Sequence, residues 1–118
     1  MKRVQKNKQL MELLQLLKKT AIENKAAVWK RVASDLEKPT RKRRIVNVYK
    51  IEKYAKDNEI VVVPGKVLGT GELNKKVTVA AYNFSDEAYK KIKEKGNPIS
   101  IKELLDKNPQ GKKIRLMG

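Results

Sequence analysis

Two stretches near the N-terminus place hydrophobic residues at helical spacing. In Leu10–Leu17, leucines repeat at i, i+3, i+4 and i+7, which is the pattern of one helix face. Trp29–Leu36 repeats this spacing, and Pro39 ends it because proline disfavours helical geometry in the residue before it. A turn over 23–25 separates the stretches. The pattern therefore predicts a helical hairpin over 9–37.

The remaining residues alternate short β-branched runs with helical patterns. Cap residues predict three helices, which begin after Asn47, Ser85 and Ser100. The first should end near 57–58 and the second at Gly96. Strands are predicted at 45–46, 60–63, 77–81 and 114–116, with Pro64-Gly65 ending the second of these and a loop over 64–76 after it. Because strands alternate with helices, an α/β fold is expected.

Composition limits the chemistry that this chain can perform. Its 118 residues suffice for one domain, and they include no Cys and no His. Disulfides, Cys/His zinc sites and catalytic triads are therefore excluded. No apolar run approaches the ~20 residues of a membrane span, and no secretory leader is recognised, so a cytoplasmic location is expected. Asp86-Glu87 fits the start of a helix rather than an acid–base pair, and we expect no enzyme activity.

Charge is the strongest indication of a partner. The chain carries 29 Lys and Arg against 13 Asp and Glu, a formal net charge of +16. Residues 1–44 are more than twice as basic per residue as residues 45–118. Such charge repels itself and is favoured when a polyanion neutralises it. Nucleic acid is the first candidate, and the alternatives are an anionic membrane surface or a lysine-rich surface that only maintains solubility.

Three basic segments are candidate phosphate contacts: an arm over 1–8, a connector over 38–44 and a cluster near the C-terminus. The connector is rich in arginine, whose planar fork matches phosphate oxygens; the alternative is a solvated linker. The residues concerned are Lys2 and Arg3 in the arm, Lys38, Arg41, Lys42, Arg43 and Arg44 in the connector, and Lys112, Lys113 and Arg115 in the cluster.

The loop over 64–76 is rich in glycine but does not match a cofactor loop. Lys66 is followed by Val67, where a P-loop requires Ser or Thr, and Asn74 occupies the place of the third glycine of a dinucleotide fingerprint. We expect no cofactor and no metal. The glycines should instead allow positive φ angles or a close backbone approach, including approach to an RNA backbone.

Aromatic residues give little support for base stacking. Trp29 lies on the apolar face of its helix and is interpreted as a core residue, with base stacking as the alternative. The tyrosines Tyr49, Tyr54, Tyr82 and Tyr89 are scattered, and no aromatic pair at strand spacing indicates a sheet of the RNA-recognition-motif type.

Several stretches together carry a family resemblance: Val28-Trp29-Lys30, Leu36-Glu37-Lys38-Pro39 with the arginines after it, Val46-Asn47-Val48, Lys53-Tyr54-Ala55, Val61 to Leu73, Lys76 to Ala81, Phe84-Ser85 and Asn108 to Leu116. With these stretches the chain resembles large-subunit ribosomal protein eighteen of the archaeal and eukaryotic type, a relative of bacterial large-subunit ribosomal protein fifteen. The resemblance covers nearly all of the chain, and its short length suits an archaeal member. It implies an irregular superhelix of β-β-α units preceded by helices.

The resemblance also implies a structural protein that binds large-subunit ribosomal RNA and neighbouring ribosomal proteins, with no membrane, small-molecule substrate or homo-oligomer. We interpret 1–118 as a single RNA-binding domain, with 45–118 as its α/β part. The predicted RNA contacts are Lys2, Arg3, Lys30, Arg31, Lys38, Arg41, Lys42, Arg43, Arg44, Asn47, Lys53, Lys66, Lys75, Lys76, Lys112, Lys113 and Arg115. The alternatives are a chromatin-type DNA-binding protein and a transient RNA-binding factor outside the ribosome.

Overall fold

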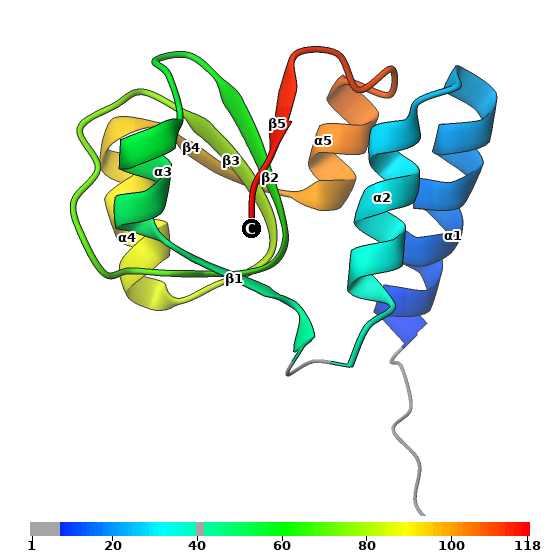
Figure 1. Cartoon of the computed structure of the whole chain (residues 1–118), viewed down its shortest axis with the longest axis horizontal. Coiled ribbons are helices and arrows are strands. Elements are labelled where there is room, and N and C mark those ends of the chain that lie inside the picture. Colours follow the sequence, from blue (N-terminus) through cyan, green and yellow to red (C-terminus); the bar gives the residue numbers. More distant parts are fainter. Residues whose placement is uncertain (1–7, 40–41) are drawn as a thin grey trace, which may run out of the picture.

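A parallel β-sheet with helices on both faces organises the computed structural model, which describes residues 8–39 and 42–118 (Figure 1). The helices are α1 (Lys8–Asn24), α2 (Ala27–Leu36), α3 (Val48–Tyr54), α4 (Asp86–Lys95) and α5 (Ile101–Lys107). The strands are β1 (Arg44–Asn47), β2 (Ile60–Leu68), β3 (Thr78–Phe84), β4 (Asn97–Ser100) and β5 (Ile114–Leu116). The predicted α/β class is confirmed.

The long strand β2 is the centre of the sheet. The strand order is β1-β2-β3-β4, and every pairing is parallel. Strand β5 also pairs with β2, through 60–62, whereas β1 pairs with 65–68. The two short strands therefore pair with successive parts of β2.

Side chains of the central strands alternate between two hydrophobic cores. Val62 and Ala80 point to the core beneath α1, α2 and α5, whereas Val61 and Val79 point to the core beneath α3 and α4. All four are buried. A strand that is buried on both faces needs a continuous apolar run, which explains the sequence of β2.

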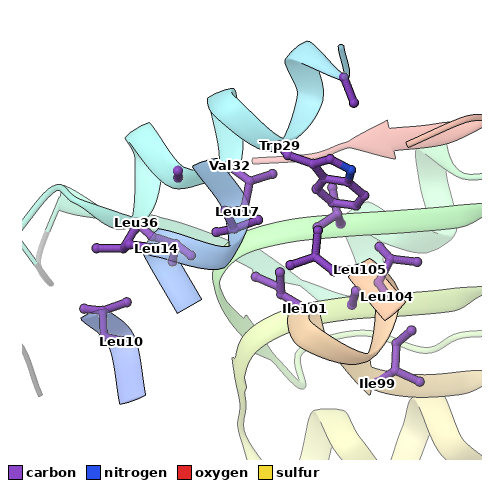
Figure 2. Packing of buried hydrophobic residues seen from close by; sticks show 14 residues of the cluster. Leu10, Leu14, Leu17, Trp29, Val32, Leu36, Ile99, Ile101, Leu104 and Leu105 are labelled. Atoms are coloured by element: carbon purple, nitrogen blue, oxygen red, sulfur yellow. The ribbon is translucent and has the colours of Figure 1, made fainter. Parts of the chain in front are cut away.

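The helical hairpin supplies the large side chains of the first core. Leu10, Leu14 and Leu17 of α1 face α2, and Trp29 lies fully buried toward α5 (Figure 2). The indole Nε1 of Trp29 donates a hydrogen bond to the backbone oxygen of Pro109, at 2.9 Å. The prediction that Trp29 is a core residue is confirmed, and its polar atom ties the hairpin to the C-terminal turn.

Two of the three predicted caps form as expected. The Ser85 side chain accepts from the amide of Ala88, and the Ser100 side chain accepts from the amide of Glu103. Asn47 does precede α3, but its side chain makes no capping bond. Its Oδ1 is buried without a hydrogen-bond partner among the described residues.

The prediction that Pro64-Gly65 ends a strand is wrong. Strand β2 continues to Leu68, and its pairing with β3 shifts between Val63 and Lys66. This irregularity accommodates a proline, which has no N–H to donate. Gly65 is required because a Cβ there would lie 2.0 Å from the backbone oxygen of Arg44 on β1.

Other boundaries also differ from the predictions. Helix α1 continues through Asn24, and the turn instead uses Lys25, whose φ is 51°. Helix α3 ends at Tyr54 rather than near 57–58. Strand β4 was not predicted at all, because four residues that include Pro98 carry too short a pattern. Gly96 does end α4, as predicted.

The crossover from β2 to β3 contains no helix. Its residues 69–77 are irregular, yet Leu73 and Val77 are buried in the core beneath α3 and α4. In the described chain the order β-β-α occurs only as β2-β3-α4, while the other strands are separated by helices. The superhelix of β-β-α units therefore stays a prediction.

Candidate nucleic-acid interface

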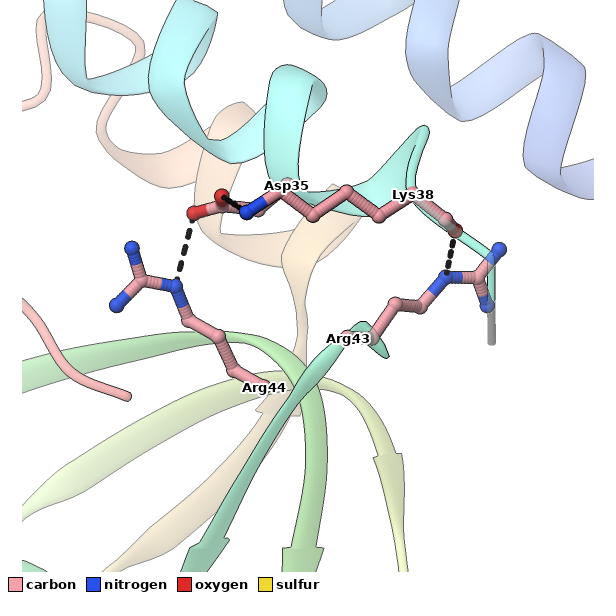
Figure 3. Close-up of polar contacts among 4 residues, drawn as sticks. All are labelled: Asp35, Lys38, Arg43 and Arg44. Carbon is pink, nitrogen blue, oxygen red and sulfur yellow. Dashed lines mark hydrogen bonds and ion pairs between the residues drawn. The ribbon is translucent and has the colours of Figure 1, made fainter. Parts of the chain in front are cut away.

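The basic connector is fastened to the end of the hairpin by a buried carboxylate. Asp35 of α2 has a side chain only 6% exposed, and its two oxygens bind different cations. Arg44 Nε lies 2.9 Å from Oδ2, and Lys38 Nζ lies 3.2 Å from Oδ1 (Figure 3). Since both cations belong to the predicted connector, the described part of that segment is anchored to α2 rather than being only a solvated linker.

Arg43 is held by a different pair of contacts. Its Nε donates to the backbone oxygen of Lys38 at 3.2 Å, and its guanidinium lies 5.4 Å from the centre of the Tyr82 ring. A cation over the face of an aromatic ring is attracted by the ring quadrupole. The connector therefore presents an arginine that two contacts within the protein hold in place.

The second basic cluster uses the same arrangement at the end of the chain. Arg115 Nε lies 3.0 Å from Glu59 Oε1. The hydrogen bond from Arg115, followed by one from the Lys56 amide, lowers the pKa of Glu59 below its ordinary value of 4.5. Lys112 and Lys113 beside it are exposed, and neither ammonium has a partner among the described residues.

These three arginines share one geometric feature. Arg43, Arg44 and Arg115 each make their internal hydrogen bond through Nε. The terminal Nη atoms of all three have no hydrogen-bond partner in 8–39 or 42–118, and in Figure 3 those of Arg43 and Arg44 point away from the anchoring contacts. A guanidinium held in this way keeps paired donors for the two oxygens of a phosphate.

The glycine-rich segment is held by protein contacts. Lys91 Nζ, on α4, lies 2.7 Å from the Gly69 oxygen and 2.6 Å from the Gly71 oxygen. Gly71 has a φ of 103°, and a Cβ there would lie 2.5 Å from that of Tyr49. The prediction that glycine serves positive φ and close approach is confirmed, and the nearest atoms are those of α3 and α4.

The predicted contact residues differ in whether their side chains make contacts within the protein. Lys75 Nζ donates to the Ala55 oxygen at 2.7 Å, and Lys53 lies 5.4 Å from the Tyr54 ring. Exposed positions with no side-chain bond among the described residues are Lys30, Arg31, Lys42, Lys66 and Lys76. Lys2, Arg3 and Arg41 lie outside the described residues. Asn47 is the last residue of β1 and directly precedes α3.

Sequence analysis missed three important groups. Asp35 could have been noticed as the one carboxylate within the apolar pattern of the second helix, directly before the basic connector. Lys91 gave no signal, because its role depends on a loop twenty residues away. Tyr82 and Tyr89 appeared scattered, yet both line one cavity at the end of β3.

Among the described residues, none of the helices combines the length and the hydrophobicity of a membrane span. Within 8–39 and 42–118, no group of three or more Asp and Glu residues could hold a metal ion. The candidate interface consists of cations, some of them held by carboxylates, with aromatic rings beside them. Cations and aromatic rings are groups that bind phosphates and bases.

Comparison with known proteins identifies the family. The model of "Ribosomal proteins 50S-L15, 50S-L18e, 60S-L27A" matches residues 24–100. The large ribosomal subunit protein eL18 of Archaeoglobus fulgidus is 53% identical over 112 residues, which cover 94% of this chain and 96% of that protein. The chain belongs to this ribosomal protein family. The eL18 proteins of Methanospirillum hungatei and Haloarcula marismortui are 49% and 46% identical, also over 94% of this chain and over 93% and 96% of their own lengths.

Membership of this family decides two earlier questions. The resemblance to the archaeal and eukaryotic type of ribosomal protein is confirmed, and so is the expectation of a structural protein rather than an enzyme. The matched residues 24–100 include α2, the described connector and all of the sheet except β5. The Asp35 anchor and the stacked Arg43 therefore lie within the part that defines the family.

Proposed function

We propose that the protein is a structural component of the large ribosomal subunit, in the cytoplasm, where its basic surface binds and stabilises ribosomal RNA. The observation that carries this proposal is the oriented connector, in which Arg43 and Arg44 are fixed through Nε and keep their Nη atoms available. The names of the eL18 relatives support the assignment to the large subunit.

The binding mechanism follows from the distribution of charge. A net charge of +16 allows contacts with several RNA segments at once, and release of condensed counterions supplies most of the affinity. The fixed arginines define the register, whereas exposed lysines such as Lys66 and Lys112 neutralise phosphates without a set geometry. The protein thus recognises the fold and backbone of the RNA rather than a base sequence.

We further propose that 1–118 acts as a single RNA-binding domain. The hairpin is packed onto the sheet through the core beneath α1, α2 and α5, which supports a rigid unit. Arm, connector and C-terminal cluster would then contact RNA from one body. Its remaining surface is available to neighbouring proteins of the large subunit.

Sedimentation tests this function directly. Cell extract from the source organism is separated on a sucrose gradient after a high-salt wash, and the protein is followed with an antibody. The proposal predicts stable co-migration with the large subunit. Recovery only at the top of the gradient would contradict it and favour a transient RNA-binding factor, whereas recovery with nucleoid DNA would favour the chromatin-type alternative.

A further inference from the structure

A groove opens where β3 extends past its neighbour β4. The pairing of these strands ends at Ala81 and Ser100, whereas β3 continues to Phe84. A cavity of about 330 Å³ occupies this site, and Tyr82, Phe84 and Tyr89 are among its lining residues. It lies at the carboxyl ends of two parallel strands, which is where open α/β sheets bind their ligands.

The two tyrosines of this groove each have a cation near the ring. Arg43 lies 5.4 Å from the centre of Tyr82, and Lys93 lies 5.7 Å from the centre of Tyr89. Phe84 meets Tyr89 edge-on, with ring centres 5.9 Å apart. Tyr89 remains 43% exposed, so one aromatic surface is accessible from solvent. Aromatic rings flanked by cations fit a base with a phosphate on either side.

Other polar groups favour a base over a phosphate inside the groove. Glu103 lines the cavity, and its carboxylate, which lies 4.0 Å from Lys107 Nζ, disfavours a phosphate there and can accept from the amino group of a base. Asn83, which is exposed at the same site, can both donate and accept. The cations are therefore suited to the flanking phosphates, and the centre of the groove is suited to the base.

We infer that this groove binds one unpaired RNA nucleotide, whose base lies against Tyr82 and Tyr89 while Arg43 and Lys93 contact the adjoining phosphates. This inference rests on the proposed function and specifies it, because bases inside a duplex are not available to aromatic side chains. The ligand is thus a bulge, loop or junction of the RNA. A peptide segment of a neighbouring protein is the competing occupant, and the test below separates the two.

The test compares binding of purified full-length variants to large-subunit ribosomal RNA of Archaeoglobus fulgidus, transcribed in vitro. Tyr89→Ala removes an exposed ring, and Tyr49→Ala is the matched control, because Tyr49 is 55% exposed on α3. Loss of stacking should weaken binding by Tyr89→Ala about 5- to 150-fold, the equivalent of ~1–3 kcal/mol. The control should bind like the wild type.

Salt dependence separates stacking from charge. Because a tyrosine neutralises no phosphate, the slope of log affinity against log salt should be the same for Tyr89→Ala and the wild type. Tyr82→Phe should bind normally, since it keeps the ring, which makes it a second variant that preserves the core. A Tyr89→Ala protein that binds as tightly as the wild type would overturn the inference.

Photocrosslinking identifies the occupant. Ultraviolet irradiation of the complex followed by mass spectrometry should attach a nucleotide within 82–89. A crosslink from this segment to a protein in reconstituted subunits, with none to RNA, would overturn the inference in favour of a peptide occupant. Wild-type protein that fails to bind the RNA at all would contradict the proposed function itself, so the two failures are distinguishable.

Discussion

The connector and the C-terminal cluster use the same ion-pair arrangement at different depths. In each, an arginine next to exposed lysines is bound through Nε to one carboxylate oxygen. At the connector, Asp35 and Arg44 are 6% and 23% exposed, whereas Glu59 and Arg115 are 21% and 37% exposed. Solvent screens the second pair more strongly, so the two pairs should differ in what they contribute to stability.

The two pairs also differ in which parts of the fold they connect. The deep pair joins α2 to β1, and therefore fixes how the hairpin meets the sheet. The shallow pair joins Glu59, directly before β2, to β5, which pairing with β2 already holds in place. We conclude that the Asp35–Arg44 pair helps to fix how the hairpin packs against the sheet, whereas the Glu59–Arg115 pair mainly orients the guanidinium of Arg115.

Removing the contact between the hairpin and the C-terminal turn should have the largest effect. Trp29 fills the core beneath the hairpin and bonds the backbone of Pro109, so Trp29→Ala should lose ~3–5 kcal/mol of unfolding free energy. Trp29→Phe keeps most of the packing and should lose clearly less. Chemical denaturation measures both. A loss below about 1 kcal/mol for Trp29→Ala would contradict the claim that this residue unites hairpin and C-terminal turn.

Breaking the deep ion pair should have the next largest effect. Asp35→Ala leaves Arg44 partly buried without its partner, and we expect a loss of about 3 kcal/mol, near the lower end for a broken buried pair. Thermal unfolding checks this value. The double variant Asp35→Ala, Arg44→Met should recover part of the loss. If the double variant were less stable than Asp35→Ala, desolvation would not explain the effect.

The shallow pair should have a small effect that depends on pH. The pKa of Glu59 is lower in the folded protein than in the unfolded chain, so its stabilisation is complete above about pH 4.5 and is lost as pH falls through the folded pKa. Glu59→Gln should therefore lose at most about 1 kcal/mol at pH 7, and the loss should shrink as the pH falls through the folded pKa. Denaturation at pH 7 and at a series of acidic pH values measures this; a loss that does not shrink at low pH would contradict the electrostatic origin.

Sequence patterns predicted well where one periodicity determined one element. The leucine spacing of α1 and the serine caps of α4 and α5 needed no knowledge of distant residues. The predicted end of strand β2 came too early, because Pro64-Gly65 normally ends a strand. The register shift that accommodates this proline and glycine depends on the neighbouring strands β1 and β3. Strand β4 could not be predicted from its own residues, because it is defined by its pairing with β3.

The candidate interface was predictable in composition but not in geometry. The basic connector was recognised from its sequence, whereas the anchoring of Arg44 by Asp35 depends on how α2 meets β1. Likewise, Tyr82 of β3 and Tyr89 of α4 line one cavity through the way α4 packs after β3, which their sequence spacing does not indicate. Local sequence thus indicates a polyanion as partner, and the tertiary structure indicates which cations are fixed.

The central claim is that the oriented connector binds RNA phosphates, and a salt titration tests it most directly. The variant Lys42→Ala, Arg43→Ala spares the Asp35–Arg44 pair, and Lys90→Ala, Lys95→Ala on α4 removes the same charge outside the predicted contacts. For large-subunit ribosomal RNA, the connector variant should lower the slope of log affinity against log salt by about 1.4–1.8, or ~0.7–0.9 per phosphate contact, while the control leaves it unchanged. Equal slopes for the two variants would contradict the account.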